Sequence, residues 1–482
     1  MSFQSLIFMV FLFFLIVILA LVRKEKVRQY LLIAMSLVFY GLWDWRFLFF
    51  VLACVAVVYW GSQVLNRSEK TVQRKTVLTI CLIVLLGILA VFKYLNFFIS
   101  GFCNLFGISP SISLQLLLPV GISFYIFSSI GFIIDVYRGE IEGRVPLYKV
   151  ALYVLFFPKI LQGPLHKAKD FLDQLNQDHP ISWNNLSAGV QVFLFGFIKK
   201  VVIADRLGLF VDTVYSTPRA YSGLTLLLVA LSYPIQLYCD FSGYTDMALG
   251  TAKMMGYELC PNFNLPFLSK TVAEYWRRWH MSLNIWFRDY LFYPIIRSEW
   301  VNNLRKKAKG NSKKLAKIIP PVMGMAIVWP LVGLWHGASW NFILYGACYG
   351  LLMIAGQIHE TYRRGNANTG LVFDIFRIIR TLVITIVLLI LFRMPDLNGF
   401  GLVVSRIITM KPGIRYYYTW SLVFIPLVMG VSIIAYKKNN GNSFYVNLNL
   451  AKFWNKVIFC TVGLLTIVFM YVGENYFMYF QF

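Results

Sequence analysis

Long apolar runs recur along almost the whole chain, and they restrict the folds that it can adopt. Of its 482 residues 59% are hydrophobic and only 14% are charged, too little charge for a water-soluble protein of this length. The runs approach the roughly 20 residues that a helix needs to cross a bilayer, and they do not alternate as membrane β-strands do. The sequence therefore predicts an all-α, polytopic membrane protein with about eleven transmembrane helices plus re-entrant segments. The apolar runs are residues 6–22, 28–43, 47–65, 76–99, 114–134, 147–163, 187–204, 221–239, 318–335, 340–356, 371–392, 420–436 and 457–473.

The net charge of +24 lies mainly in the connections between these runs. Basic residues follow the first run, recur within residues 66–75, and outnumber acidic ones by eight to one between Arg297 and Lys317. Lys199 and Lys200 are predicted to mark a cytoplasmic helix end. Because Lys and Arg accumulate on the cytoplasmic side, this distribution predicts an N-terminus outside. It also favours anionic lipid head groups over nucleic acid as partners.

The N-terminus and the cysteines predict no processing, metal or disulfide chemistry. Residues 1–5 lack the positive region of a cleaved signal peptide, so the first run is predicted to be a permanent span. The seven Cys form no CxxC pair, and no zinc-peptidase, phosphate-loop or serine-hydrolase motif occurs. We therefore expect no bound cofactor and no metal.

The middle of the chain differs in composition from both ends. Residues 1–135 and 346–482 are plain apolar spans, whereas residues 136–345 include polar, Pro-rich and Trp-rich segments. We expect one transmembrane domain over residues 1–482, with the chemistry in its middle zone. Three polar segments are predicted to be re-entrant pieces lining a cavity, and ordinary connecting loops are the alternative. These segments are residues 157–164, 240–246 and 262–266.

Residues 274–293 are predicted to form one amphipathic helix with two separate sides. A helix at the membrane interface and a helix lining an internal tunnel both explain the pattern. For His280, a structural hydrogen bond and a functional role both stay open. The polar side holds Arg277, His280, Asn284 and Arg288, and the aromatic side Trp276, Trp279, Leu283, Trp286 and Tyr290.

His336 lies beside Trp335 at the junction of two apolar runs, in a chain with only five His. Ionisable residues inside a membrane usually mark a substrate path or a reaction. Burial keeps an imidazole neutral, which is the state that a general base needs. We therefore advance His336 as the catalytic base of an acyl transfer, with a hydrogen bond to a neighbouring helix as the alternative.

Several strings resemble the membrane-bound O-acyltransferase family, and together they extend over essentially the whole chain. Others resemble its bacterial branch, which exports acyl groups for cell-surface polymers and contains alginate, peptidoglycan and teichoic-acid enzymes. The first group is Asn262–Phe267, Tyr275–Tyr290 and Leu334–Trp340, and the second is Leu118–Phe124, Asp240–Asp246 and Tyr479–Phe482.

The resemblance implies a ring of helices around a central funnel in the bacterial cytoplasmic membrane. It implies His336 as the family's signature histidine and His280 as a second one. It also implies a cytoplasmic acyl thioester, and an extracytoplasmic partner transferase that places the acyl group on a polymer.

The leading hypothesis is acetyl transfer from acetyl-CoA to an extracytoplasmic polysaccharide or peptidoglycan. Asp240 and Asn284 would position groups in the tunnel beside His280, framed by Trp279 and Trp335. Arg277 or Arg278 would stabilise the oxyanion, or else anchor the helix at the interface.

Two alternatives stay open. One is D-alanyl transfer to teichoic acid from an acyl-carrier protein that docks on residues 297–317. The other is a transporter or flippase with no covalent step. Ile295–Trp300 and His166 depart from the family's usual pattern, and this leaves the acyl donor open.

Overall fold

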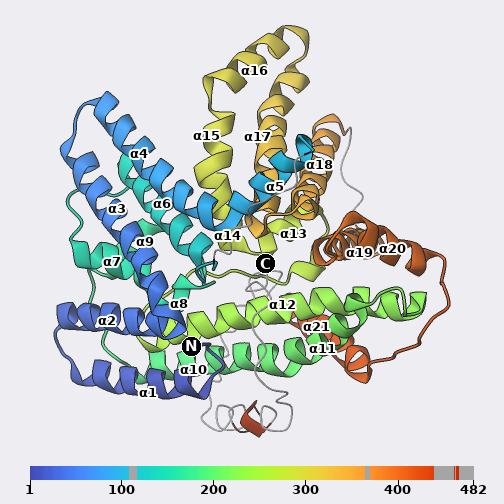
Figure 1. Cartoon of the computed structure of the whole chain (residues 1–482), viewed down its shortest axis with the longest axis horizontal. Coiled ribbons are helices and arrows are strands. Elements are labelled where there is room, and N and C mark those ends of the chain that lie inside the picture. Colours follow the sequence, from blue (N-terminus) through green and yellow to red (C-terminus); the bar gives the residue numbers. More distant parts are fainter. Residues whose placement is uncertain (108–116, 364–369, 439–460, 462, 466–482) are drawn as a thin grey trace. The chain divides into compact units, whose positions relative to one another are not determined.

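The computed structural model is built from helices (Figure 1) and describes residues 1–107, 117–363, 370–438, 461 and 463–465. Within these ranges an isolated bridge between Tyr221 and Ile414 is the nearest approach to a strand. The all-α prediction is confirmed. Most of the run predicted at 457–473 and the closing string Tyr479–Phe482 lie outside the described residues.

Seven helical stretches in the described part of the chain are long and apolar enough to cross a membrane, as expected of a multi-pass membrane protein. Shorter apolar helices add to them at Leu6–Leu21, Leu397–Ile408 and Thr419–Ile434. The number of eleven spans and the ring around a funnel stay predictions. The seven stretches are Glu25–Arg67, Thr71–Cys103, Trp183–Ser216, Gly223–Met254, Lys313–His336, Trp340–Tyr362 and Leu371–Arg393.

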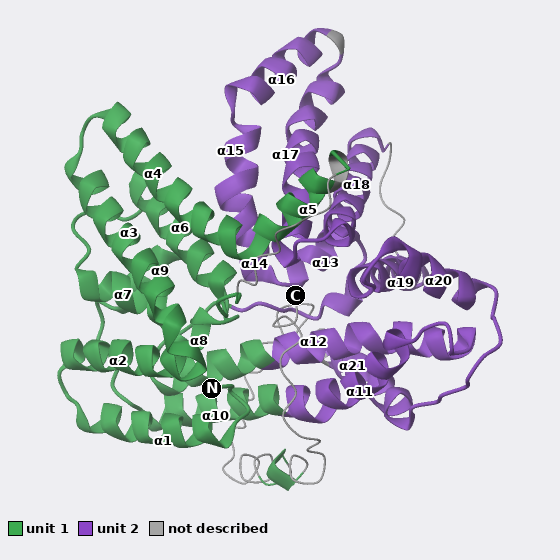
Figure 2. Ribbon diagram, in the orientation of Figure 1, with its two compact units in different colours: residues 1–197, 244–260, 447–465 green, residues 198–243, 261–446, 466–482 purple. Residues whose placement is uncertain are grey.

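The chain divides into two compact units (Figure 2), which are described separately. Unit 1 contains residues 1–197, 244–260 and 447–465, and unit 2 contains the rest. The helices of unit 1 are α1 (Leu6–Leu21), α2 (Glu25–Asp44), α3 (Leu48–Arg67), α4 (Thr71–Leu89), α5 (Leu95–Leu105), α6 (Ile122–Arg138), α7 (Leu147–Leu155), α8 (Phe157–Ile160), α9 (Ala168–Gln174) and most of α10 (Trp183–Ile198).

Helix α6 is the core of unit 1. It is buried around most of its circumference and packs on α3 and α4. Gly121 and Gly139, both with left-handed backbone, begin and end it. A Cβ on Gly121 would lie 2.5 Å from the carbonyl oxygen of Ile160, so glycine allows α6 to begin directly against the segment after α7.

The predicted interruption at residues 157–164 is confirmed. Helix α7 ends at Leu155, and only the four-residue α8 follows before the chain becomes irregular. Pro158 cannot donate a backbone hydrogen bond, and Gly163 passes so close to Lys159 that a Cβ would lie 2.3 Å from its Cα. The predicted span at 147–163 is therefore broken.

Unit 2 is organised around the antiparallel pair α17 and α18, which lie side by side (Figure 1). A Cβ on Gly333 would lie 2.0 Å from the carbonyl oxygen of Phe342, and one on Gly346 would lie 2.2 Å from that of Trp329. Small residues thus let the two backbones touch, as is common between membrane helices. The helices of unit 2 are α11 (Asp205–Ser216), the first part of α12 (Gly223–Met254), α13 (Val272–Arg278), α14 (Met281–Phe287), α15 (Tyr293–Ile296), α16 (Glu299–Asn311), α17 (Lys313–His336), α18 (Trp340–Tyr362), α19 (Leu371–Arg393), α20 (Leu397–Ile408) and α21 (Thr419–Lys438).

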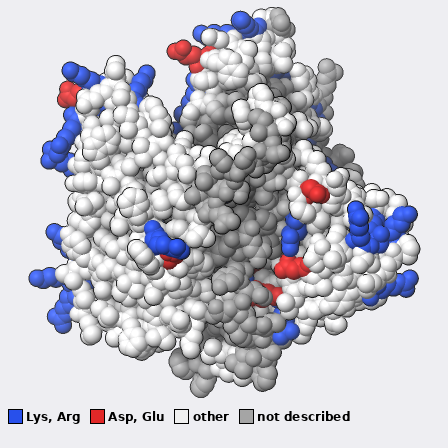
Figure 3. Space-filling view, in the orientation of Figure 1, with Lys and Arg blue, Asp and Glu red and all other residues white. Residues whose placement is uncertain are grey.

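The charged surface agrees with a membrane location. On the face drawn in Figure 3 uncharged residues cover most of the surface, while Lys and Arg lie over α16. Helix α16 joins α17 in a hairpin that holds the basic stretch Arg297–Lys317.

Two predictions about polar residues in this part of the chain are wrong. Residues 240–246 do not interrupt α12, which runs on to Met254. Lys199 and Lys200 do not mark a helix end, because a π-helical turn, Lys199–Ala204, carries the helix on into α11. Both errors have one cause: Lys200 binds the carboxylate of Asp240 at 2.7 Å, and Lys199 donates to the hydroxyl of Ser242 at 3.0 Å. Pairing of this kind replaces the water that polar groups would otherwise need.

Candidate active site

His280 lies in a break between two short helices, so the prediction of one helix over residues 274–293 is wrong. Helix α13 ends at Arg278, Trp279 is extended, and His280 is left-handed with φ 45° before α14 begins. A left-handed non-glycine residue is unfavourable by about 1 kcal/mol or more and persists only where its surroundings enforce it. The predicted polar and aromatic sides therefore do not continue across this point.

Asn284 enforces the break from the side of α14. Its amide nitrogen donates to the carbonyl oxygens of Trp276 at 2.6 Å, Trp279 at 2.7 Å and His280 at 3.2 Å. The carbonyls of Trp276 and Trp279 lie at the end of α13, where the helix has no further backbone donors, and that of His280 also accepts from the backbone N–H of Asn284 at 3.1 Å. Asn284 thus caps the end of α13, and its role in a tunnel stays a prediction.

The connection before α13 enforces the break from the other side. The backbone N–H of Met281 donates to the carbonyl of Asn262 at 2.9 Å, and that of Asn264 donates to the carbonyl of Arg278 at 2.8 Å. This connection includes the predicted turn-rich stretch at 262–266, which has no α-helix, and Leu265 in it is left-handed.

The imidazole of His280 is completely buried. Its Nδ1 lies 3.1 Å from Oδ1 of Asn262, and its ring contacts Phe241 edge-on at 4.7 Å between centroids and Trp335 at 5.6 Å. Burial lowers the pKa of His280 to about 3, because the surroundings disfavour the imidazolium. His280 is therefore neutral at physiological pH.

His336 is the last residue of α17 and is also buried. Four aromatic rings surround its imidazole, those of Trp335, Phe342, Tyr345 and Phe392. Trp335 contacts both His336, at 4.8 Å between centroids, and His280. The structure thus brings the two predicted histidines to the same indole.

The other predicted site residues are in part engaged elsewhere. The carboxylate of Asp240 binds Lys200, which also binds Asp205 at 2.7 Å. The guanidinium of Arg278 donates to Glu274 at 2.9 Å. Trp279 stacks on Tyr275 at 5.7 Å between centroids.

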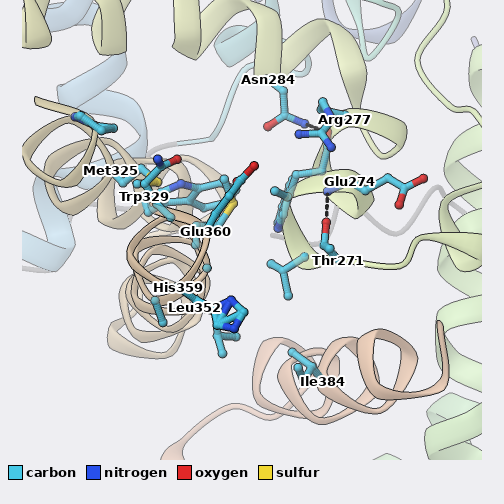
Figure 4. A pocket seen from close by; sticks show the side chains of 18 of the residues that line it. Thr271, Glu274, Arg277, Asn284, Met325, Trp329, Leu352, His359, Glu360 and Ile384 are labelled. Atoms are coloured by element: carbon cyan, nitrogen blue, oxygen red, sulfur yellow. Dashed lines mark hydrogen bonds between the residues drawn. The ribbon is translucent and has the colours of Figure 1, made fainter. Parts of the chain in front are cut away.

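A cavity of about 1120 Å³ opens beside this site within unit 2 (Figure 4). Its lining combines an apolar, aromatic wall with a set of charged side chains. Asn284 and Arg277 from the predicted site line it, whereas Arg278 does not. The apolar lining includes Trp276, Phe287, Phe292, Met325, Trp329 and Ile384, and the charged lining Lys270, Glu274, Arg277, Arg288, Glu360, Arg363, Arg377 and Arg380.

The cavity follows α17 and α19 towards His336. On α17 its lining runs from Pro321 to Val332, one helical turn before His336. On α19 it includes Arg377 and Arg380, while Phe392 of the same helix contacts His336. Arg377 is fifteen residues from Phe392, roughly 22 Å along the axis. The arginines of α19 therefore line the end of the cavity remote from His336.

Comparison with known proteins identifies the family. Residues 29–392 match the model of the membrane-bound O-acyltransferase family, MBOAT, and this range includes both histidines. The chain belongs to the membrane-bound O-acyltransferase family. The family resemblance that the sequence strings predicted is thereby confirmed.

The names of three relatives of this membrane-bound O-acyltransferase refer to alginate, peptidoglycan and teichoic acid. The chain is 37% identical over 330 residues to a probable alginate O-acetylase, AlgI, of Azotobacter vinelandii, with 67% of this chain and 62% of that protein aligned. It is 29% identical over 357 residues to the peptidoglycan O-acetyltransferase of Helicobacter pylori, with 69% and 64% aligned. It is 29% identical over 257 residues to the teichoic acid D-alanyltransferase of Bacillus subtilis, with 51% and 60% aligned. The chain spans less than two thirds of the length of each of these relatives.

Sequence reasoning missed two residues at this membrane-bound O-acyltransferase site. Asn262 was treated only as part of a turn, and Lys200 only as the end of a helix. A polar residue inside an apolar stretch was the available signal for both. Among the described residues no group of three His, Cys, Asp or Glu could hold a metal ion.

Proposed function

We propose that this chain moves an acetyl group from a cytoplasmic thioester donor across the membrane for O-acetylation of an extracytoplasmic polysaccharide or peptidoglycan. Membership of the O-acyltransferase family supports acyl transfer, and the names of the alginate and peptidoglycan relatives support O-acetylation of a surface polymer. The observation that carries the proposal is the cavity that follows α17 and stops one turn before His336.

The lining of the cavity suits acetyl-CoA as the donor. Arg363, Arg377 and Arg380 line it far from His336, and guanidinium groups recognise phosphate oxygens in a bidentate manner. Trp276 and Trp329 offer apolar surface nearer the histidines for the thioester arm. A donor lying in this direction has its anionic groups at the arginines and its acyl carbon towards His336.

The two histidines divide the work of the transfer. His336 removes the proton of the accepting hydroxyl while its oxygen attacks the thioester carbonyl. The C–S bond then breaks and the acyl group stays on the acceptor oxygen. The thiolate leaves with the proton that His336 removed from the hydroxyl. His280 accepts a hydrogen bond from a second hydroxyl of the acceptor and so orients the acceptor for attack. Arg277, which lines the cavity, stabilises the oxyanion, and the pairing of Arg278 with Glu274 favours Arg277 for this role.

In this proposal the donor enters from the cytoplasm. The arginine end of the cavity includes the end of α18, where Lys314 lies 5.2 Å from the ring centroid of Tyr362. Lys314 belongs to the basic hairpin, which the distribution of charge assigns to the cytoplasm, with the N-terminus outside. The acetyl group leaves on the opposite side of the bacterial cytoplasmic membrane, where a partner transferase places it on the polymer.

Replacing His336 with Ala tests this function. The purified protein in lipid vesicles is given acetyl-CoA and a soluble acceptor, and thiol release and ester formation are followed. We expect His336→Ala to abolish both, while His179→Ala, a histidine of unit 1 that binds the carbonyl of Gln174, retains them. Ester formation by His336→Ala at the native rate would overturn the assignment.

Two other functions give different results in the same assay. D-alanyl transfer from a carrier protein is favoured by the eight basic residues between Arg297 and Lys317 and by the teichoic acid relative. It would show no thiol release from acetyl-CoA, and neutralising the hairpin would weaken binding of the carrier. A transporter or flippase would consume no thioester at all.

A further inference from the structure

The orientation of the Asn262 side chain is decided by a backbone donor. The N–H of Ser282 points at the terminal atom of Asn262 that is 3.2 Å away, and the Ser282 hydroxyl lies 2.9 Å from the same atom. A backbone N–H can only donate, so this atom is the amide oxygen, Oδ1. Turning the amide around would place two donors against each other.

The same oxygen determines the tautomer of His280. Nδ1 of His280 lies 3.1 Å from Oδ1 of Asn262, and an amide oxygen can only accept. Nδ1 must therefore carry the hydrogen. Because the buried ring is neutral, Nε2 carries a lone pair, and any group that meets Nε2 must donate to it.

Stability alone does not explain why position 262 is an asparagine. It is completely buried, and its amide nitrogen has no hydrogen-bond partner among the described residues. Serine would offer Ser282 an acceptor without leaving two buried N–H groups unmatched. Aspartate would also accept from both partners, but its charge would favour protonation of the ring. Asparagine is the side chain that accepts twice and adds no charge.

Two aromatic side chains also contact the ring. Phe241 of α12 and Trp335 of α17 contact the imidazole through their rings. The nearest titratable residue along α12 is Asp240, whose carboxylate binds Lys200. Beyond Trp335 along α17 lies His336.

We propose that Asn262 is a positioning residue that holds His280 as the Nδ1–H tautomer, so that Nε2 accepts a hydrogen bond from a second hydroxyl of the acceptor. The consequence for catalysis rests on the proposed acyl transfer, but the tautomer does not. Loss of Asn262 leaves His280 in place and lets its hydrogen move to Nε2, where it repels the hydroxyl hydrogen.

Nitrogen NMR of the full chain, labelled with ¹⁵N-histidine in detergent micelles, tests the tautomer directly. The chain has only five His, so the signals of His280 are those that His280→Gln removes. We expect the native protein to show a protonated Nδ1 and an unprotonated Nε2, and Asn262→Ala to convert at least half of His280 to the opposite tautomer. Asn264→Ala is the matched control, since the described contacts of Asn264 to Arg278 run through its backbone, and it should leave the tautomer unchanged. A native Nε2–H form, or an Asn262→Ala spectrum like the native one, would overturn the proposal.

Asn262→Asp keeps the shape of the side chain and covers the case in which Asn262→Ala does not fold. A carboxylate on Nδ1–H should raise the midpoint of His280 protonation by roughly 1–3 pH units in the same spectra. The acid side of the rate profile should move in the same direction, with kcat falling more than the KM for acetyl-CoA rises. An unchanged midpoint contradicts the positioning role. If the spectra behave as expected and no variant, native included, transfers acetyl groups, the proposed function fails and the positioning role of Asn262 stands.

Discussion

Two buried histidines at two helix breaks show how one hydrogen bond decides what an imidazole can do. His280 lies between α13 and α14 in unit 2, and His166 follows the break after α8 in unit 1. Burial lowers the pKa of each to about 3, with nearby Lys159 contributing at His166. Nδ1 of His280 meets the acceptor Oδ1 of Asn262, whereas Nδ1 of His166 accepts from the backbone N–H of Cys260 at 3.0 Å.

The two rings therefore present opposite chemistry at Nε2. His166 must carry its hydrogen there, and this Nε2 is buried with no acceptor among the described residues. Lys159 adds a second buried donor, with Nζ 3.5 Å from the ring centroid of Tyr153. His280 instead carries a lone pair at Nε2, and Asn284, which donates to the carbonyl of His280, lines the cavity of unit 2. Burial alone thus does not identify a histidine that can accept a hydrogen bond from a substrate, and the partner on the far nitrogen does.

The largest expected effect is a difference in acetyl-transfer rate between variants of His280 and of His166. His280→Ala should lower acetyl transfer by roughly 10²-fold, the cost of a misplaced reacting group, because the acceptor loses the side chain that orients it. His166→Ala should leave the rate within about threefold, since its ring offers only a donor. Single-turnover transfer by protein in vesicles measures both. Equal losses of transfer rate in the two variants would contradict the different roles of the two histidines.

The next largest effect should come from two glycines at close backbone contacts, one in each unit. Gly333→Ala in α17 and Gly121→Ala before α6 would each force a Cβ against a carbonyl oxygen, at 2.0 and 2.5 Å. Each should lower the free energy of unfolding by roughly 1–3 kcal/mol through overpacking, and the left-handed backbone of Gly121 adds to the cost there. Thermal melting in detergent measures this. Of the two, only Gly333→Ala should also slow transfer at temperatures where the protein stays folded, because α17 carries His336.

Acid should destabilise the protein through both histidines equally. A pKa near 3 in the folded chain and near 6.5 in the unfolded chain means that only the unfolded chain binds a proton between these values. Stability is therefore full above pH 6.5 and falls as the pH drops, by roughly 2 kcal/mol per histidine at pH 5. His280→Gln and His166→Gln should each remove about that much of the difference between melts at pH 7.5 and pH 5. If a Gln variant loses as much stability at pH 5 as the native protein does, the replaced histidine has no lowered pKa in the folded chain.

The smallest effect should distinguish the surroundings of the two rings. Lys159→Met removes a positive neighbour of His166, so the pKa of His166 should rise by about one unit or less, while His280 stays unchanged. Histidine NMR titration of the labelled protein measures both at once. A shift of His280 of the same size would point to a general change in packing instead.

The residues that the sequence placed correctly are those whose behaviour depends on neighbours along the chain. Apolar runs predicted the long helices, and Pro158 with Gly163 predicted the break after α7, because proline and glycine act through local backbone chemistry. The family strings singled out His280 and His336. Where partners lie far away in sequence, prediction failed: Lys200 accommodates Asp240 inside a continuous helix, and Asn262 breaks the helix predicted over residues 274–293.

By itself, the sequence determined that this chain is an all-α membrane protein of the O-acyltransferase family with two histidines in its middle zone. Helical periodicity and hydrophobicity are properties of the chain that survive any arrangement of the helices. Only the tertiary structure decided that Trp335 contacts both rings, that a cavity stops one turn from His336, and that His280 presents a lone pair at Nε2. A tautomer depends on which atom lies within hydrogen-bond distance of Nδ1, and at His280 that atom belongs to a residue eighteen positions earlier in the chain.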